Sequence, residues 1–193
     1  MSGRKAPPAQ GIYVAENLRL AFQGLGYTLV EGIAEADLAI TDCLTDEYRS
    51  ALLAGKRVLW LAEQSDSLQT NLPGLKLAAR QGSPWQGDWA SSISWIHRDG
   101  MFRALPGSGL VDFMFQDLTP EVVLVGFSPR EFWQEVQAGL CVGWLHKPVA
   151  LIGERVLGRG RVLACTLSLS DRLESNPLAA YLLDEMIASL LQD

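Results

Sequence analysis

The chain has 193 residues, a length that suits one domain with a sizeable core. Hydrophobic residues make up 48% of it and charged residues 20%, and the formal net charge at pH 7 is −6. The acidic balance and the scattered basic residues argue against nucleic acid as a partner, because binding to a phosphate backbone needs a basic stripe. The apolar runs are too short to cross a bilayer, so we expect an ordinary globular fold and no membrane partner.

The first ten residues, MSGRKAPPAQ, are rich in Pro, Gly and Ala and lack the apolar segment of a secretory signal. We predict a flexible arm over residues 1–10 and a single domain over residues 11–193. The three cysteines, Cys43, Cys141 and Cys165, are odd in number and far apart, which disfavours a disulfide framework. No group of His, Cys or Asp has metal-ligand spacing, so we expect a reducing, cytoplasmic setting with no metal and no cofactor.

The front of the chain alternates between strand and helix patterns. Residues 11–32 predict a strand, a helix and a second strand, and residues 36–42, ADLAITD, predict a buried strand. Residues 44–56 predict a helix with Thr45 as its N-cap, and residues 57–63, RVLWLAE, predict a further buried strand. The resulting β-α-β-β-α-β order favours helices packed on a mostly parallel sheet.

The back of the chain has strand patterns joined by short connections. They cover residues 119–127, 136–145, 148–158 and 160–170. The last three predict an antiparallel meander rather than another βαβ unit, because the turns between them are short.

Residues 176–191 predict a closing helix, with Asn176 as the N-cap and Pro177 at the first helical position. Its expected buried face consists of Leu178, Leu182, Met186 and Leu190. Asp184 and Glu185 are expected to be solvated charges on this helix. The predicted fold class is therefore α/β: a mostly parallel sheet flanked by helices, an antiparallel C-terminal strand meander and a closing helix.

A tryptophan-rich stretch interrupts this pattern between residues 64 and 107. Trp85, Trp89 and Trp95 fall within eleven residues of a glycine-containing segment that lacks a strong strand or helix period. We predict that the loop from 83 to 102 meets a partner: a protein domain, a second copy of the chain or a sugar chain. Tryptophan is enriched at interfaces and stacks on ring faces. The alternative is that the three indoles are buried and cover the sheet edge.

Cys43 is the best-placed candidate nucleophile, because it follows a predicted strand and precedes a predicted helix. Its flanks, TDCLT, hold none of the glycines of a nucleophile elbow. Asp42 and Asp46 are expected to raise the pKa of the thiol, whereas a reactive thiol needs a lowered pKa. The pattern therefore favours a Cys43 that does not act as a catalytic nucleophile.

The remaining thiols and the two histidines do not complete a catalytic group. Cys141 and Cys165 lie between apolar residues within predicted strands, which favours core positions. His146 lies in a predicted turn, and His97 stands beside Asp99 with no nucleophile near it in the sequence. The sequence therefore predicts no catalytic residue.

Several stretches resemble the C-terminal accessory region found in some bacterial relatives of glycoside hydrolase family 2. They are LVDFMFQDLTPEVVLVGF, VQAGLCVGWLHKPVALIGERVLGRGRVLACTLSL, NPLAAYLLDEM and EADLAITDCLTDEYRSALLAGKRVLWLAE, so the similarity spans most of residues 11–192. That region resembles class I glutamine amidotransferase-like, flavodoxin-like domains, including those appended to β-galactosidases, where they are usually catalytically silent.

The resemblance transfers no catalytic residue. Active amidotransferases hold the cysteine in a G-x-C-x-G elbow with a later His and Glu, whereas this chain has TDCLT around Cys43 and no His-x-Glu. The catalytic carboxylates of family 2 hydrolases belong to a separate barrel domain, for which 193 residues leave no room. The resemblance implies a non-catalytic accessory or interaction domain. The alternatives are a small cysteine-dependent hydrolase or amidotransferase-like enzyme and a carbohydrate-binding module using Trp85, Trp89 and Trp95.

Overall fold

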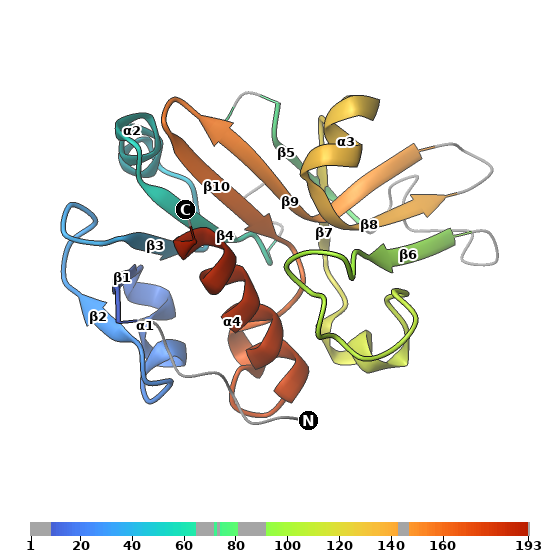
Figure 1. Ribbon diagram of the computed structural model, residues 1–193, viewed down its shortest axis with the longest axis horizontal. Coiled ribbons are helices and arrows are strands. Elements are labelled where there is room, and N and C mark those ends of the chain that lie inside the picture. The colour runs from blue at the N-terminus through green and yellow to red at the C-terminus, as the bar shows by residue number, and fades with distance from the viewer. Residues whose placement is uncertain (1–8, 65–71, 73, 81–91, 143–146, 193) are drawn as a thin grey trace.

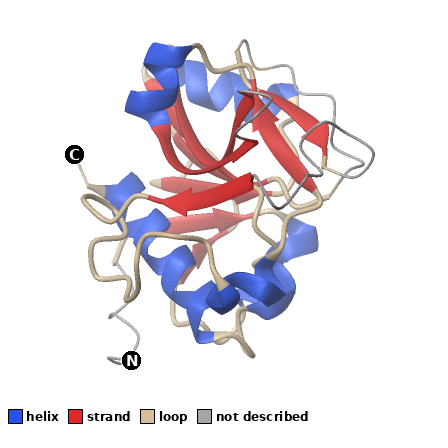
Figure 2. Ribbon diagram, turned by 90° about the vertical axis from the view of Figure 1, so that its right-hand side faces the viewer, coloured by secondary structure: helices blue, strands red, loops and turns tan. Residues whose placement is uncertain are grey.

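The computed structural model of the chain describes residues 9–64, 72, 74–80, 92–142 and 147–192. These residues form one ten-stranded sheet with helices on both of its faces (Figures 1 and 2). The strands are β1 Gly11–Val14, β2 Thr28–Val30, β3 Leu38–Thr41, β4 Arg57–Leu61, β5 Lys76–Ala79, β6 Ser92–Ile96, β7 Val122–Val125, β8 Val136–Val142, β9 Lys147–Leu157 and β10 Gly160–Cys165. The helices are α1 Glu16–Phe22, α2 Asp46–Ala54, α3 Pro129–Glu135 and α4 Pro177–Leu191, with 3₁₀ helices η2 Phe113–Leu118 and η4 Ser170–Arg172.

Five parallel strands form one half of the sheet, in the order β2-β1-β3-β4-β10. Four of them come from residues 11–61, so the predicted β-α-β-β-α-β unit is confirmed. Nearly all side chains of β3 and β4 are buried on both faces of the sheet, as expected for parallel strands covered by helices. Gly55 ends α2 with a φ of 106°, the left-handed conformation that lets the chain turn directly into β4.

The other half of the sheet is antiparallel. β8, β9 and β10 pair in succession, which confirms the predicted C-terminal meander. β9 pairs with β8 along its first part, with β10 along its last part, and with β7 where Ala150 lies opposite Leu124. β5 adds to β7, and β6 adds to β8. β10 also pairs in parallel with β4, so it joins the two halves of the sheet.

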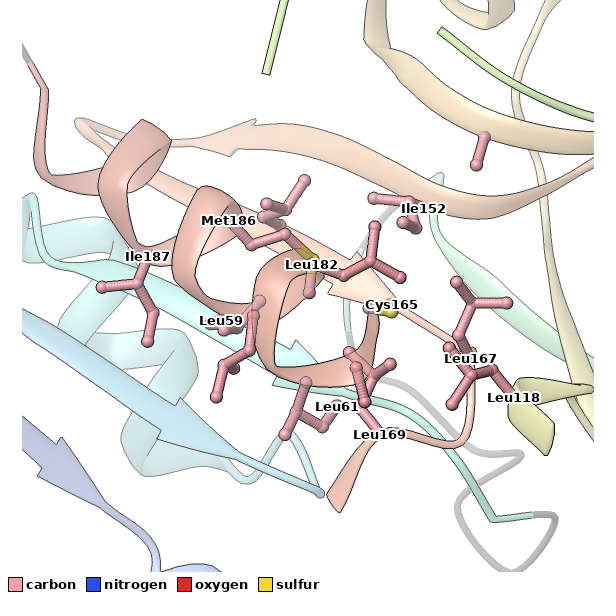
Figure 3. Packing of buried hydrophobic residues seen from close by; sticks show 14 of the residues in the cluster. Leu59, Leu61, Leu118, Ile152, Cys165, Leu167, Leu169, Leu182, Met186 and Ile187 are labelled. Atoms are coloured by element: carbon pink, nitrogen blue, oxygen red, sulfur yellow. The ribbon is translucent and has the colours of Figure 1, made fainter. Parts of the chain in front are cut away.

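Two apolar clusters cover the two faces of the sheet. Alternate residues of β4 fall into different clusters: Leu59 packs with α1 and α4, whereas Trp60 packs with α2. Figure 3 shows Leu182 and Met186 of α4 close to Leu59 and Cys165. Helices therefore cover both sides of the parallel strands, in agreement with the predicted α/β class.

The closing helix α4 begins and packs as predicted. The Asn176 side chain accepts hydrogen bonds from the backbone N–H groups of Leu178 and Ala179, and Pro177 occupies the first helical position. The predicted buried face is confirmed, with exposures of 3% or less for Leu178, Leu182, Met186 and Leu190. Neither α4 nor any other described helix has the length and apolar character needed to span a membrane.

The expectation that Asp184 and Glu185 are solvated is wrong. Glu185 is only 8% exposed, and Asp184 accepts a hydrogen bond from the Tyr27 hydroxyl. The reason is that α4 has neighbours on more sides than its apolar sequence pattern indicates. It packs against the sheet, η2 and η4, and it also contacts Tyr27, just before β2.

Two strands and one α-helix, β5, β6 and α3, go beyond the sequence predictions, as do the 3₁₀ helices η2 and η4. α3 starts with a capping box: the Ser128 N–H donates to the Glu131 carboxylate at 2.7 Å, and the Glu131 N–H donates to the Ser128 hydroxyl at 3.4 Å.

The prediction of a loop over residues 83–102 is wrong for residues 92–96. These residues form β6, because they pair with β8 although their own sequence pattern is weak.

Leu182→Ala should lower the free energy of unfolding by about 2–5 kcal/mol, because it removes a fully buried side chain from the α4 cluster. The matched control Leu20→Ala removes a side chain of α1 that is 77% exposed and should change stability by at most about 0.5 kcal/mol. Urea midpoints of both variants measure the difference. Equal effects would contradict the assignment of α4 to the core.

Candidate functional site

The carboxyl ends of four parallel strands meet at one edge of the sheet. β1, β3, β4 and β10 run in the same direction, so the segments that follow them lie along this edge. The chain passes from β1 to β2 on one side and then returns to β3 on the other side of β1, with α1 and α2 on opposite faces. In open α/β sheets such a switch in direction leaves a crevice at the carboxyl ends of the strands. The fold therefore favours a ligand site at this edge.

A pocket of about 250 Å³ lies at this edge. It is lined by residues that follow the parallel strands and by the start of α1, namely Asn17, Leu18, Asp42, Leu61, Glu63, Gln64, Ser170 and Asp171. Three of these described side chains are carboxylic acids and none is basic, so the lining is acidic. The pocket offers mainly hydrogen-bond acceptors.

Glu63 connects the end of β4 to the segment between β10 and α4. Its carboxylate accepts hydrogen bonds from the backbone N–H groups of Leu169 at 3.0 Å and Ser170 at 2.9 Å, and from the Ser170 hydroxyl at 2.7 Å. Burial raises the pKa of Glu63 against the lowering effect of these hydrogen bonds, and the charge of Asp171 raises it further. Because both oxygens are engaged, Glu63 acts as a structural clamp.

Asp42 is held in place at the end of β3. Its carboxylate accepts a hydrogen bond from the Asn17 side-chain amide, and its backbone carbonyl accepts one from the Trp60 indole N–H at 3.0 Å. Trp60 is fully buried, so it locks the ends of β3 and β4 together. The Asp42 carboxylate therefore stays beside the next residue, Cys43.

Cys43 lies exposed on the turn after β3. Partial burial of its thiol and the negative charge of Asp42 raise the pKa of Cys43, and hydrogen bonding with the Thr41 hydroxyl only partly offsets this. The predicted effect of Asp42 is confirmed. A thiol with a raised pKa holds less thiolate at neutral pH and is a poor nucleophile.

The other predicted thiol and histidine positions lie elsewhere. Cys165 is fully buried and burial raises its pKa strongly, so its core position is confirmed, whereas Cys141 is only half-buried. His97 follows β6 in the antiparallel half, with its Nδ1 3.6 Å from Oδ1 of Asp99. His146 lies outside the described residues. The structure therefore separates His97 from the edge that holds the exposed thiol.

Of the predicted binding tryptophans, Trp85 and Trp89 lie outside the described residues, and their binding role stays a prediction. Trp95 lies half-buried on β6, with its ring centre 5.8 Å from that of Phe132 on α3. Its indole also covers the backbone of Gly139 on β8, where a Cβ would come within 2.8 Å of the ring. Trp95 thus packs between β8 and α3.

The sequence predictions did not single out Asn17, Glu63, Ser170 or Asp171. A signal was present for the first two, because Asn17 follows the first predicted strand closely and Glu63 ends the predicted strand segment 57–63. Carboxyl ends of parallel strands meet at one edge, and this rule places both residues there. No comparable local signal marks Ser170, which is brought in by the pairing of β10 with β4.

No family model matches the sequence, and no curated protein matches it. Among solved structures, the fold is similar to an exo-β-1,4-mannosidase from Opitutaceae bacterium strain TAV5, with a TM-score of 0.52 and 13% identity over 97% of this chain and 37% of that chain. It is similar to a cytoplasmic protein from Salmonella typhimurium, with a TM-score of 0.50 and 8% identity over 94% of this chain and 98% of that chain. A β-galactosidase from Bacillus circulans sp. alkalophilus has a TM-score of 0.48 and 11% identity over 95% of this chain and 30% of that chain. At these identities the likenesses to the mannosidase and to the Salmonella protein show the fold alone, and this chain spans little more than a third of the mannosidase.

Glu63→Gln should change how stability depends on pH. The pKa of Glu63 is raised in the folded chain, so between the ordinary carboxyl pKa of about 4.3 and the raised value the folded state binds more protons than the unfolded state. The contribution of Glu63 is present below that window and is lost as pH rises through the raised pKa. The wild type should therefore lose stability relative to Glu63→Gln as pH rises, as measured by urea midpoints from about pH 4 to 8.

Glu131→Gln is a matched control, because the pKa of Glu131 is shifted in the opposite direction to that of Glu63. Hydrogen bonds from Ser128, together with Arg155, lower the pKa of Glu131 to about 2. The wild type should therefore lose stability relative to this variant as pH falls below about 4.3. A stability difference between wild type and Glu63→Gln that is constant with pH would contradict the burial assigned to Glu63.

Proposed function

We propose that the chain is a non-catalytic accessory or interaction domain, related to the C-terminal region of glycoside hydrolases and of the class I glutamine amidotransferase-like type. The observation that supports this best is the environment of Cys43. The thiol lies at the carboxyl edge of the sheet, where α/β folds bind their ligands, yet partial burial and Asp42 raise its pKa. Its surroundings oppose the chemistry that an amidotransferase would need.

A cysteine hydrolase would also need a base within hydrogen-bond reach of the thiol. The described residues that line the pocket at this edge include no histidine, and the carboxylate beside the thiol, Asp42, raises the pKa of Cys43. The Glu63 carboxylate and the Asp42 carbonyl both accept hydrogen bonds that hold strand ends together, and His97 belongs to the antiparallel half. The polar groups at this edge therefore serve to hold strand ends together.

The share of each similar chain that the likeness covers supports an accessory role. The likeness to the mannosidase takes in nearly all of this chain but only 37% of the mannosidase, so the shared fold is one part of a larger chain. The likeness to the Salmonella protein takes in 98% of that chain, so a similar fold also makes up nearly a whole chain. Under this proposal the domain supplies contacts to another protein domain or a second copy, and glycoside hydrolysis belongs to other parts of such assemblies.

Iodoacetamide should label Cys43 more slowly than free cysteine at neutral pH, because the raised pKa leaves less thiolate. Cys165 should be labelled only after unfolding, because it is fully buried. Mass spectrometry of peptides from native and urea-unfolded protein measures both rates. Faster labelling of Cys43 than of free cysteine, with glutaminase or esterase turnover that is lost in Cys43→Ser, would overturn the proposed function.

The isolated chain should hydrolyse no nitrophenyl glycoside. Most glycosidases place two carboxyl groups on either side of the scissile bond, whereas hydrogen bonds to both oxygens of Glu63 hold its carboxylate against residues 169–170. Release of nitrophenol, followed by absorbance, measures turnover. Hydrolysis that disappears in Glu63→Gln or Asp171→Asn would show that the acidic pocket is a reaction site.

A further inference from the structure

The pocket at the carboxyl edge of the parallel strands is large enough for a small molecule. Its volume is about 250 Å³, whereas about 10–15 Å³ suffices for one water molecule. Pockets for drug-sized ligands have volumes of about 300–1,000 Å³, so this pocket suits a smaller ligand. It lies where the chain direction switches between β1 and β3, which is where open α/β sheets bind ligands. Its size and position therefore indicate a ligand site.

Some polar groups in the lining of this pocket are not used within the fold. Asp171 of η4 and Gln64, which follows β4, are exposed, and their side chains make no hydrogen bond with another described residue. The Oδ1 atom of Asp42 is buried and also lacks a hydrogen-bond partner among the described residues. A buried polar atom without a partner is costly, so a ligand that donates a hydrogen bond to it is favoured.

The charge of the lining decides the chemical class of the ligand. Asp42, Glu63 and Asp171 are acidic, and no described residue of the lining is basic. The charge of Asp171 raises the pKa of Glu63, which means that these two carboxylates repel each other. A cation bound beside them relieves this repulsion, whereas an anion adds to it. The lining therefore selects a positively charged ligand.

An organic cation suits these groups better than a bare metal ion. Both oxygens of Glu63 accept hydrogen bonds from residues 169–170, so this carboxylate is directed at donors of the protein. The described residues hold no group of three or more His, Cys, Asp or Glu side chains that could bind a metal ion. An ammonium group has three N–H donors, which match separate carboxylate and amide oxygens such as those of Asp171 and Gln64.

We propose that the pocket binds a small organic cation, whose ammonium group donates hydrogen bonds to Asp42, Gln64 and Asp171. Asp42 follows β3 and Asp171 belongs to the segment after β10, so the ligand bridges groups from different strand ends. The inference goes beyond the proposed function, because a domain that only contacts other proteins needs no small-molecule site. Binding breaks no bond, so it is compatible with a non-catalytic domain.

Isothermal titration calorimetry of the full chain with putrescine tests the site, because putrescine is a small diamine with an ammonium group at each end. Butanediol, with hydroxyl groups in place of the amines, is the neutral control. Putrescine should bind with a millimolar or lower Kd, and butanediol should not bind.

Two variants of the pocket should weaken putrescine binding. Asp171→Asn removes one charge and should weaken binding by about tenfold, as loss of a charged hydrogen-bond partner does. Gln64→Lys places an ammonium group of the protein at the pocket and should have an effect at least as large. The matched control Asp99→Asn removes the same charge from a 94% exposed side chain after β6 and should leave binding unchanged. Urea midpoints should confirm that all three variants fold, because the substituted side chains are exposed.

Absence of putrescine binding at millimolar concentrations would overturn the proposal, and so would equal binding of butanediol. Unchanged binding in both Asp171→Asn and Gln64→Lys would place the diamine elsewhere on the chain and would also overturn it. Calcium chloride is a further probe, and calcium binding that disappears in Asp171→Asn would show a metal site instead. These results leave the thiol and glycoside assays unaffected, so a failure of the ligand site is distinguishable from a failure of the non-catalytic function.

Discussion

The double pairing of β10 is the constraint on which the rest of the fold depends. On one side β10 pairs in parallel with β4, and on the other side it pairs antiparallel with β9. The start of the strand passes close under α2, where a Cβ at Gly160 would overlap with the carbonyl oxygens of Leu52 and Lys56. Only glycine fits this approach, and the buried residues 162–165 then carry the strand through the core.

The exit of β10 shapes the carboxyl edge of the sheet. It brings Ser170 to Glu63 at the end of β4, where the carboxylate satisfies backbone N–H groups that would otherwise be partly buried without partners. The same edge is where α/β folds commonly bind ligands. In this chain Glu63 ties the end of β4 to the segment after β10, and the nearby Asp42 disfavours a thiolate at Cys43. The same strand ends thus hold both the Glu63 carboxylate and the Asp42 charge that raises the pKa of Cys43.

The antiparallel half is held by a different interaction, centred on Arg155 of β9. Its guanidinium lies 2.8 Å from the Glu131 carboxylate and 2.5 Å from that of Glu135, both on α3, and it donates to the Gly74 carbonyl at 3.0 Å. It also lies over the Phe127 ring, 4.4 Å from the centroid. With only 11% of its side chain exposed, Arg155 needs these several partners, because a charge removed from water is costly unless it is paired.

Features that depend on neighbouring residues could be predicted. Apolar runs predicted β3 and β4, and Asn176 predicted the start of α4, because a cap and its helix are only a few residues apart. The raised pKa of Cys43 was predictable for the same reason, since Asp42 is the preceding residue. The capping box at Ser128 was also present in the sequence, although the helix that it starts is short.

Features that depend on distant residues could not be predicted. Glu63 and Ser170 meet across 107 positions, Glu185 is buried by segments that pack around α4, and β6 is a strand because β8 lies beside it. By itself the sequence determined the α/β class, the order of the front elements and the unfavourable surroundings of Cys43. Only the tertiary structure decided which strand β10 joins, which carboxylate becomes a clamp and which acidic side chains line one pocket. These outcomes arise from contacts between segments far apart in the chain, which no local pattern of residues specifies.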